Sequence, residues 1–436
     1  MRTKSVVVVL ALALVLTLTS YVGRAQQKDL YTEFELLSRI VQEVQDKYVD
    51  DVDKRKLFEG AIKGMLAELD PYSQYITREM LEEFKIDTEG QFGGLGIEIG
   101  LRDGILTVLT PIVGTPAFKA GVMAGDRILK IDGKPTEGIT LKDAVGKLRG
   151  KPGDKVTLTV LHEGAQSPEE ITLAREIIQV PSVQLARLVD EEAKIGYVHV
   201  TNFQEKTAAS LDEAVKKLEK EGMKALVLDL RFNPGGLLSS AIEVADLFID
   251  KGIIVATKGR KSAQNDTHDA KSKGTYRNFP MVVLINKGSA SASEIVAGAI
   301  RDHKRGLLLG EKTWGKGSVQ SVIQLEGGKS ALKLTTAKYY TPSGECIHEK
   351  GIQPDIEVKL TTTQMKSLGE YMSRLHVDEN RPPKDNRKNS ESKGESKDAA
   401  KRDKPEAADK EPADVQLQRA VDMLKAVQVY QKLQSS

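Results

Sequence analysis

The fold of this chain is decided by the segment Ala225-Leu226-Val227-Leu228-Asp229-Leu230-Arg231-Phe232-Asn233-Pro234-Gly235-Gly236. Its first four residues form a continuous apolar run, which is typical of a strand that is buried on both faces of a sheet. The Pro-Gly-Gly turn ends that strand, and the sequence from Leu237 to about Phe248 predicts a helix. A strand that passes through a tight turn into a helix is the unit from which α/β domains with parallel sheets are built.

Apolar runs of the same kind continue this pattern along the chain. They lie at residues 253–256, 282–285 and 307–309 and alternate with helical segments. We therefore predict an α/β domain with a largely parallel sheet over residues 177–376.

Length and composition restrict the function. A chain of 436 residues is long for one core, so we expect two or three compact units. Together with the predicted α/β domain and the helical segments described below, this predicts an α/β protein of the α+β multidomain type. The 64 basic and 62 acidic residues nearly balance, which gives no electrostatic case for binding nucleic acid. Cys346 is the one cysteine, so no disulfide can form within the chain.

The N-terminus has the pattern of a secretory signal peptide. Arg2 and Lys4 precede a run of Val, Leu and Ala over residues 6–16, and small residues follow at Gly23 and Ala25. We predict a signal peptide over residues 1–25, with an uncleaved membrane anchor as the alternative. Either interpretation places the body of the protein outside the cytoplasm, in the periplasm or an equivalent compartment.

Helical segments are expected at both ends of the mature chain. Apolar residues at spacings of three and four predict an N-terminal helical arm over residues 26–86. Residues 377–412 are highly charged and almost free of large apolar side chains, so we predict a disordered linker there. An amphipathic helix follows over residues 413–436, either docking on its own protein or binding a partner.

Two segments 25 residues apart carry the candidate chemistry. Gly288-Ser289-Ala290-Ser291-Ala292-Ser293-Glu294 follows a predicted strand and opens a helix, so a serine there sits beside free helix N–H groups. The second segment is Thr313-Trp314-Gly315-Lys316-Gly317-Ser318-Val319-Gln320, in which Lys316 and Gln320 project to one face of an extended chain. The plainer alternatives are a capping box at Ser291 and a solvated turn at Lys316.

These segments resemble those of the C-terminal processing peptidases, or tail-specific proteases, which are serine peptidases with a Ser-Lys dyad. The resemblance covers nearly the whole chain. It implies that Ser291 is the nucleophile, that Lys316 is the base and that Gln320 orients the lysine. It also implies a crotonase-like fold for the protease domain. The resemblance, and not the local chemistry, selects Ser291 over Ser289 and Ser293.

Residues 87–176 resemble a PDZ domain inserted before the protease domain. The segment Phe92-Gly93-Gly94-Leu95-Gly96-Ile97-Glu98-Ile99 is similar to the loop and strand that hold a peptide C-terminus. Glycine-permitted turns direct N–H groups toward a terminal carboxylate, and the strand edge pairs with the peptide. The peptide-binding residues implied are Gly93, Gly94, Leu95, Gly96 and Ile97. A phosphate loop is the alternative, but no helix with a lysine follows.

The sequence supports an acyl-enzyme mechanism. Ser291 attacks the carbonyl while neutral Lys316 takes its proton, so burial must lower the lysine pKa from about 10.4. Trp314 is expected to exclude water. The expected oxyanion donors are the N–H of Ala292 and one from Gly235 or Gly236. A histidine base and a Cys346 nucleophile remain as alternatives.

The predicted partners follow from these assignments. We expect protein substrates with apolar, unstructured C-termini, a homodimer or higher homo-oligomer, and a helical-repeat adaptor as in related proteins. No cofactor or metal is expected. Two other functions stay open: a catalytically inert PDZ scaffold, and a crotonase-type acyl-CoA enzyme.

Overall fold

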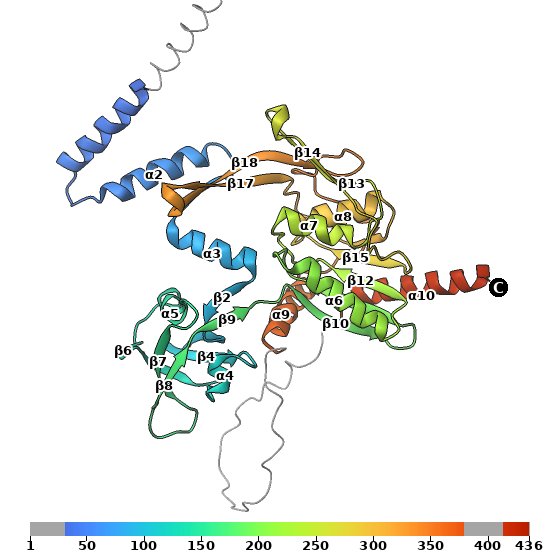
Figure 1. Ribbon diagram of the computed structural model, residues 1–436, viewed down its shortest axis with the longest axis horizontal. Helices are drawn as coiled ribbons and strands as arrows, with labels where there is room; N and C mark the ends of the chain where they lie inside the picture. Colours follow the sequence, from blue (N-terminus) through green and yellow to red (C-terminus); the bar gives the residue numbers. More distant parts are fainter. Residues whose placement is uncertain (1–30, 379–412, 436) are drawn as a thin grey trace, which may run out of the picture. The chain divides into compact units, whose positions relative to one another are not determined.

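The structure is a computed structural model that describes residues 31–378 and 413–435 (Figure 1). The predicted signal peptide and nearly all of the predicted charged linker lie outside the described residues. Within the described part, no helix combines the length and the apolar character needed to cross a bilayer. The chain divides into two compact units, one made of residues up to Arg78 with Gln320–Thr335, and one made of the rest.

The first unit is small and mostly helical. It contains a helix over residues 31–47, α2 (Lys54–Ala67) and β1 (Gln74–Ile76). β1 pairs antiparallel with the first part of β18 (Ser330–Tyr340), and β17 (Ser318–Leu325) also pairs with β18. The Asp53 side chain accepts the Arg55 N–H at 2.8 Å and so caps α2.

The second unit begins with α3 (Arg78–Glu89) and a PDZ-like module. Its core is a six-stranded antiparallel sheet with apolar side chains such as Leu106, Ile128 and Leu158 fully buried. The short strands β2 (Gln91–Gly94) and β9 (Glu176–Gln179) pair at the entry and exit of the module. The sheet and its two helices are β3 (Ile97–Arg102), β4 (Ile105–Pro111), β5 (Arg127–Ile131), β6 (Lys134–Pro135), β7 (Lys155–Leu161), β8 (Glu169–Ala174), α4 (Pro116–Lys119) and α5 (Leu141–Leu148).

The predicted parallel sheet is present in the same unit, and the mixed α/β class is confirmed. Its strand order is β10-β11-β12-β15-β16-β19, in which every pair except β10-β11 is parallel. The bounds are β10 (Val183–Asp190), β11 (Ile195–Val200), β12 (Ala225–Asp229), β15 (Met281–Ile285), β16 (Leu307–Gly310) and β19 (Ile356–Glu357).

Helices cover both faces of this sheet, which explains its continuous apolar strands. In β12, Leu226 and Leu228 belong to the core beneath three helices, whereas Ala225 and Val227 face the C-terminal helix. The three helices are α6 (Thr207–Lys220), α7 (Leu238–Asp246) and α8 (Ala292–Asp302), and the C-terminal helix is α10 (Val415–Ser435) (Figure 1).

One strand was assigned to the wrong sheet by the sequence pattern. Residues 253–256 form β13 (Ile253–Gly259), but β13 pairs antiparallel with β14 (Asp266–Asp269) and with β18 in a second sheet. The apolar run predicts a buried strand correctly. The run cannot identify the strand with which β13 pairs, because β18 lies about 80 residues further along the chain.

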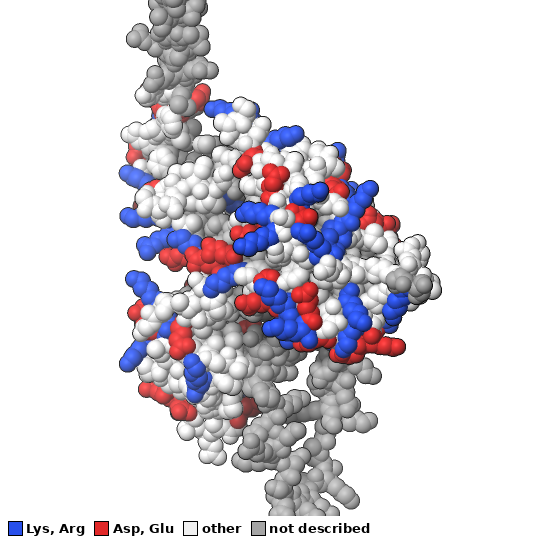
Figure 2. Space-filling model, turned by 45° about the vertical axis from the view of Figure 1, so that its right-hand side comes forward, with Lys and Arg blue, Asp and Glu red and all other residues white. Residues whose placement is uncertain are grey.

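Surface charge is mixed, as the composition suggests. On the face shown in Figure 2, basic and acidic side chains are interspersed over the described surface. This face therefore has no continuous basic stripe of the kind that tracks a nucleic-acid backbone.

The C-terminal helix is attached to the sheet by a buried ion-pair network. The Arg231 guanidinium is fully buried and contacts the Asp229 and Asp414 carboxylates, each at 2.6 Å. It also donates to Gln416 Oε1 at 3.0 Å. Burial opposes the charged form of Asp229, but the Arg231 charge outweighs it and holds the pKa of that carboxyl below its ordinary value. The network joins the start of α10 to the residue that precedes the Phe232–Gly236 turn.

We predict that Asp414→Asn destabilises the second unit by about 3 kcal/mol, because it removes one partner of a buried charge. The measurement is the midpoint of urea unfolding. Asp422→Asn is the matched control, since Asp422 is exposed and bonds to Gln418 on the same helix. Equal midpoints for the two variants would show that the network does not hold α10.

Candidate active site

Ser291 lies at the turn between β15 and α8, at the N-cap position of the helix. Its backbone has φ 55° and ψ −112°, a conformation that is strained for a residue with a side chain. The side chain is 7% exposed. A serine held in this way has its hydroxyl at a helix N-terminus, with limited access to solvent.

The three serines of the segment differ in their hydrogen bonds and in their exposure to solvent. The Ser289 hydroxyl is fully buried, donates to the Leu230 carbonyl at 2.7 Å and accepts the Asn286 N–H at 3.0 Å. The Ser293 hydroxyl is also fully buried and donates to the Asn233 carbonyl at 2.9 Å. Both therefore have structural roles, and Ser291 alone of the three combines partial access with positive φ.

Asn233 holds the glycine turn against the serine segment. Its side-chain amide donates to the Val200 carbonyl at 2.8 Å, and its backbone carbonyl accepts the Ala290 N–H at 3.0 Å. The side chain is fully buried. Sequence analysis treated Asn233 only as part of a turn, although an Asn-Pro-Gly-Gly sequence does predict a side chain that bonds to nearby backbone.

The glycine turn lies directly against Ser291. A Cβ atom on Gly235 would lie 2.8 Å from the Ser291 Cβ and 3.0 Å from the Ala292 nitrogen. Gly235 has φ 106° and Gly236 has φ 148°. The N–H of Gly235 donates to the Asn233 side chain at 2.9 Å, so this predicted oxyanion donor is engaged within the turn.

A buried carboxylate joins the serine and lysine segments. One oxygen of Glu294 accepts the backbone N–H groups of Ser291 at 2.8 Å and of Lys316 at 2.9 Å. The Glu294 contact with Ser291 is one half of the predicted capping box. The contact with Lys316 was not predicted, because no sequence pattern shows what a carboxylate meets beyond its own helix.

Tyr339 is a further neighbour of the serine that sequence analysis missed. Burial raises the pKa of the Tyr339 phenol to about 12, and a hydrogen bond with the Ser291 side chain acts in the opposite direction. Its backbone N–H donates to the Gly317 carbonyl at 2.8 Å, beside Lys316. Tyr339 lies 48 positions after Ser291 in the sequence, and its place follows from strand pairing in β18.

The segment that carries Lys316 is only partly shielded from solvent. Lys316 is half-buried, and the Trp314 side chain is 66% exposed, so the indole does not exclude water as expected. Gln320 belongs to the first unit, where its amide donates to Thr335 Oγ1 at 3.3 Å.

The predicted peptide-binding residues occupy the first strands of the PDZ-like module. Gly93 and Gly94 lie in β2, which pairs with β9. The Leu95 side chain is buried in the core, and Ile97 begins β3. Gly96 has φ 72°, and a Cβ atom there would lie 2.3 Å from the Thr115 Cβ. β3 is the edge strand of its sheet.

The alternative catalytic groups have other surroundings. His303 caps the far end of α8, where its Nε2 lies 2.7 Å from the Ile253 carbonyl. His199 is buried with Nε2 3.4 Å from the Arg231 carbonyl. Cys346 is a half-buried free thiol. The Nε2 atoms of both histidines thus lie against backbone carbonyls.

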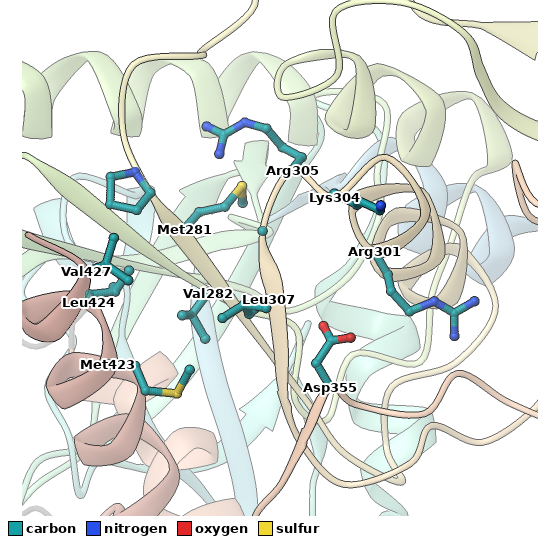
Figure 3. Close-up of a pocket in the computed structure, with 12 residues that line it drawn as sticks. Met281, Val282, Arg301, Lys304, Arg305, Leu307, Asp355, Met423, Leu424 and Val427 are labelled. Atoms are coloured by element: carbon teal, nitrogen blue, oxygen red, sulfur yellow. The ribbon is translucent and has the colours of Figure 1, made fainter. Parts of the chain in front are cut away.

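A pocket of about 300 Å³ lies elsewhere, between α10 and the region where α8 meets β16 (Figure 3). Apolar side chains of α10 line one side, and the basic side chains of Arg301, Lys304 and Arg305 lie on the other. Arg301 is paired with Asp302 and Glu345. None of the predicted site residues lines this pocket, which is formed by Pro280, Met281, Val282, Arg301, Lys304, Arg305, Gly306, Leu307, Asp355, Met423, Leu424 and Val427.

Comparison with known proteins finds three matched segments in the chain. Residues 194–358 match the model of peptidase family S41. Residues 107–161 match a PDZ domain, and residues 17–80 match the N-terminal domain of the activating protease CtpB. The S41 match contains both Ser291 and Lys316.

Alignments with known relatives cover most of the chain. A carboxy-terminal-processing protease of Bartonella bacilliformis is 44% identical over 362 residues, which cover 80% of this chain and 82% of that protein. The carboxy-terminal processing protease CtpA of Bacillus subtilis is 37% identical over 356 residues, covering 81% and 75%. The solved photosystem II D1 C-terminal processing protease aligns with 32% identity and a TM-score of 0.44, over 74% of this chain and 92% of its own. The Bartonella and Bacillus relatives confirm the family resemblance seen in the sequence, and the chain belongs to the carboxy-terminal processing proteases, which are serine proteases with an S41 peptidase domain and a PDZ domain.

Proposed function

We propose that this protease cleaves peptide bonds through an acyl-enzyme formed on Ser291, with Lys316 as general base. The observation that carries the proposal is the single Glu294 oxygen that accepts the backbone N–H groups of both residues. It brings into one site two residues that are 25 positions apart. The engagement of Ser289 and Ser293 in buried hydrogen bonds leaves Ser291 as the nucleophile.

The proposed reaction has two steps. Neutral Lys316 takes the Ser291 proton as Oγ attacks the scissile carbonyl, and it then protonates the leaving amine. Water hydrolyses the resulting ester, again with Lys316 as the base. Only the uncharged amine can accept the proton. Because removal from water disfavours the ammonium form, the half-buried Lys316 side chain has to lose its contact with water when substrate binds. Gln320 orients the lysine in this scheme, a role that rests on the family resemblance.

For the oxyanion we infer donors from both segments that meet at Ser291. The N–H of Ala292 lies in the first turn of α8, where backbone N–H groups have no acceptor within the helix. The N–H of Gly235 is engaged by Asn233, so Gly236 supplies the second donor of the turn.

Tail recognition is assigned to the edge strand β3 and the loop before it. A substrate C-terminus adds a strand to β3, and its carboxylate lies at the turn around Gly96. The positive φ of Gly96 and its contact with Thr115 fix the course of the backbone there. Substrates are then proteins with apolar, unstructured C-termini, processed in the periplasm or an equivalent compartment.

Assembly is assigned to the N-terminal arm. The helix over residues 31–47 exposes a groove in which the apolar side chains of Leu36, Ile40, Val44 and Tyr48 lie beside those of Arg39, Glu43 and Lys47, and Ile40 is 50% exposed. Exposed apolar surface of this kind marks an interaction site. We propose that a second copy of the chain covers it, so that the protease is a homodimer or a higher homo-oligomer. A helical-repeat adaptor is the further partner implied by the family resemblance.

We predict that Ser291→Ala and Lys316→Ala each lower kcat at least about a thousandfold on an unstructured reporter protein. The wild-type rate is expected to rise with pH, because deprotonation of Lys316 generates the base. The measurement is cleavage followed by electrophoresis, with binding of a tail peptide as the parallel readout. His348→Ala is the control for a base near the lysine segment and is expected to retain activity.

Wild-type rates in the Lys316 variant would contradict the dyad. A protein that binds tails tightly but never cleaves the reporter would instead be the inert PDZ scaffold.

We predict that Gly96→Ala weakens binding of an apolar tail peptide about tenfold, or by about 1.4 kcal/mol, because the new Cβ displaces the loop. Binding is measured by fluorescence anisotropy in the Ser291→Ala background. Gly104→Ala is the matched control, since Gly104 has φ 77° but open space around it. Equal effects of the two changes would place tail binding elsewhere.

We predict that Ile40→Asp converts the assembly to a monomer, because it places a charge in the apolar groove. Light scattering coupled to size-exclusion chromatography measures the mass. Glu35→Lys on the same helix is the control and should leave the mass unchanged. A wild-type protein that is already monomeric would rule out this assembly.

A further inference from the structure

Glu294 is a carboxylate in an unusual setting, fully buried in the first turn of α8. Its Oε2 accepts the N–H groups of Ser291 and Lys316 at 2.8 and 2.9 Å. Its Oε1 accepts the Gly315 N–H at 2.8 Å and the Thr313 hydroxyl at 2.5 Å. Four donors thus converge on one side chain.

These donors come from the two catalytic segments and from nowhere else. One belongs to the nucleophile itself, and three belong to the loop that carries the lysine. Because both Oε2 contacts end on the same atom, the backbones of Ser291 and Lys316 cannot separate without breaking one of them. The distance between the two segments is therefore set by Glu294.

Thr313 supports the carboxylate from the other side. Its hydroxyl donates to Glu294 and accepts the Ile352 N–H at 2.7 Å. The adjacent Trp314 N–H donates to the Ser289 carbonyl at 3.0 Å, which adds a second connection between the two segments. The loop is consequently held at several points, and the Thr313 hydroxyl is the one that a substitution can remove without changing the backbone.

The arrangement requires an acceptor with two equivalent oxygens. A glutamine would place its NH₂ group against the N–H donors of Ser291 and Lys316 or, in the opposite orientation, against the Gly315 N–H and the Thr313 hydroxyl. The ionised form is further favoured by the N-terminus of α8. Burial raises the pKa of the Glu294 carboxyl above its ordinary value, and the hydrogen bonds from Thr313, Gly315, Ser291 and Lys316 offset part of that rise.

We propose that Glu294 is the positioning residue of the catalytic centre, setting the separation of nucleophile and base through their backbones while Thr313 orients its carboxylate. The proposal rests on the Ser-Lys function proposed above. Glu294 does not contact the reacting atoms. It acts on the rate of acyl transfer and leaves tail binding unaffected.

The test compares Thr313→Val with Thr313→Ser, since valine has nearly the shape of threonine without its hydroxyl and serine retains the hydroxyl. Steady-state cleavage of a short unstructured peptide gives kcat and KM, and anisotropy gives tail affinity. We expect Thr313→Val to lower kcat at least about tenfold with KM and tail affinity unchanged, because the loss is in geometry at the reacting centre. Thr313→Ser should recover kcat to within about threefold of wild type.

Glu294→Gln is expected to lower kcat further than Thr313→Val, and thermal unfolding shows whether each variant is folded. The proposal is overturned if folded Thr313→Val cleaves at the wild-type rate, if its defect lies in KM alone, or if Thr313→Ser is equally impaired. Absence of cleavage by the wild-type protein would instead remove the proposed Ser-Lys function.

Discussion

The convergence of four hydrogen bonds on the buried Glu294 carboxylate is the constraint on which the proposed active site depends. A carboxylate removed from water is costly unless donors replace its hydration, and here three backbone N–H groups and the Thr313 hydroxyl, all from the two proposed catalytic segments, do so. The free-energy cost of burial therefore favours a single geometry. If either segment moved away, a charge would remain buried without its full set of partners.

The rest of the scaffold holds the Ser291 segment in this geometry. Asn233 ties the glycine turn to β11 and to the serine segment, and Gly235 lies so close to Ser291 that no side chain fits between them. Arg231, two residues before Asn233, is fixed by carboxylates on β12 and before α10. The residues at the start of the C-terminal helix thus help to place the Phe232–Gly236 turn, although Gly236 precedes Asp414 by 178 positions in the sequence.

Sequence predicted the elements well because their signals are local. The run Ala225–Leu228 indicates a strand buried on both faces, and the resemblance of residues 87–176 to a PDZ domain indicates the PDZ-like module. The partner of β13, the role of Glu294 and the contact of Tyr339 with Ser291 were not predictable, because each depends on residues distant in sequence that meet only in the folded chain. The exposed Trp314 was predicted wrongly for the same reason. Residue type indicates a tendency to be buried, but the surroundings decide whether it is.

The most direct test of the proposed chemistry is mass spectrometry of peptides from enzyme that is acid-quenched during turnover of an activated ester substrate. The acyl group should be found on the peptide that contains Ser291, with fragmentation assigning it to that residue, and it should be absent from the Ser291→Ala variant. An acyl group on Ser289, Ser293 or Cys346 would contradict the account, as would turnover of the substrate without any covalent adduct.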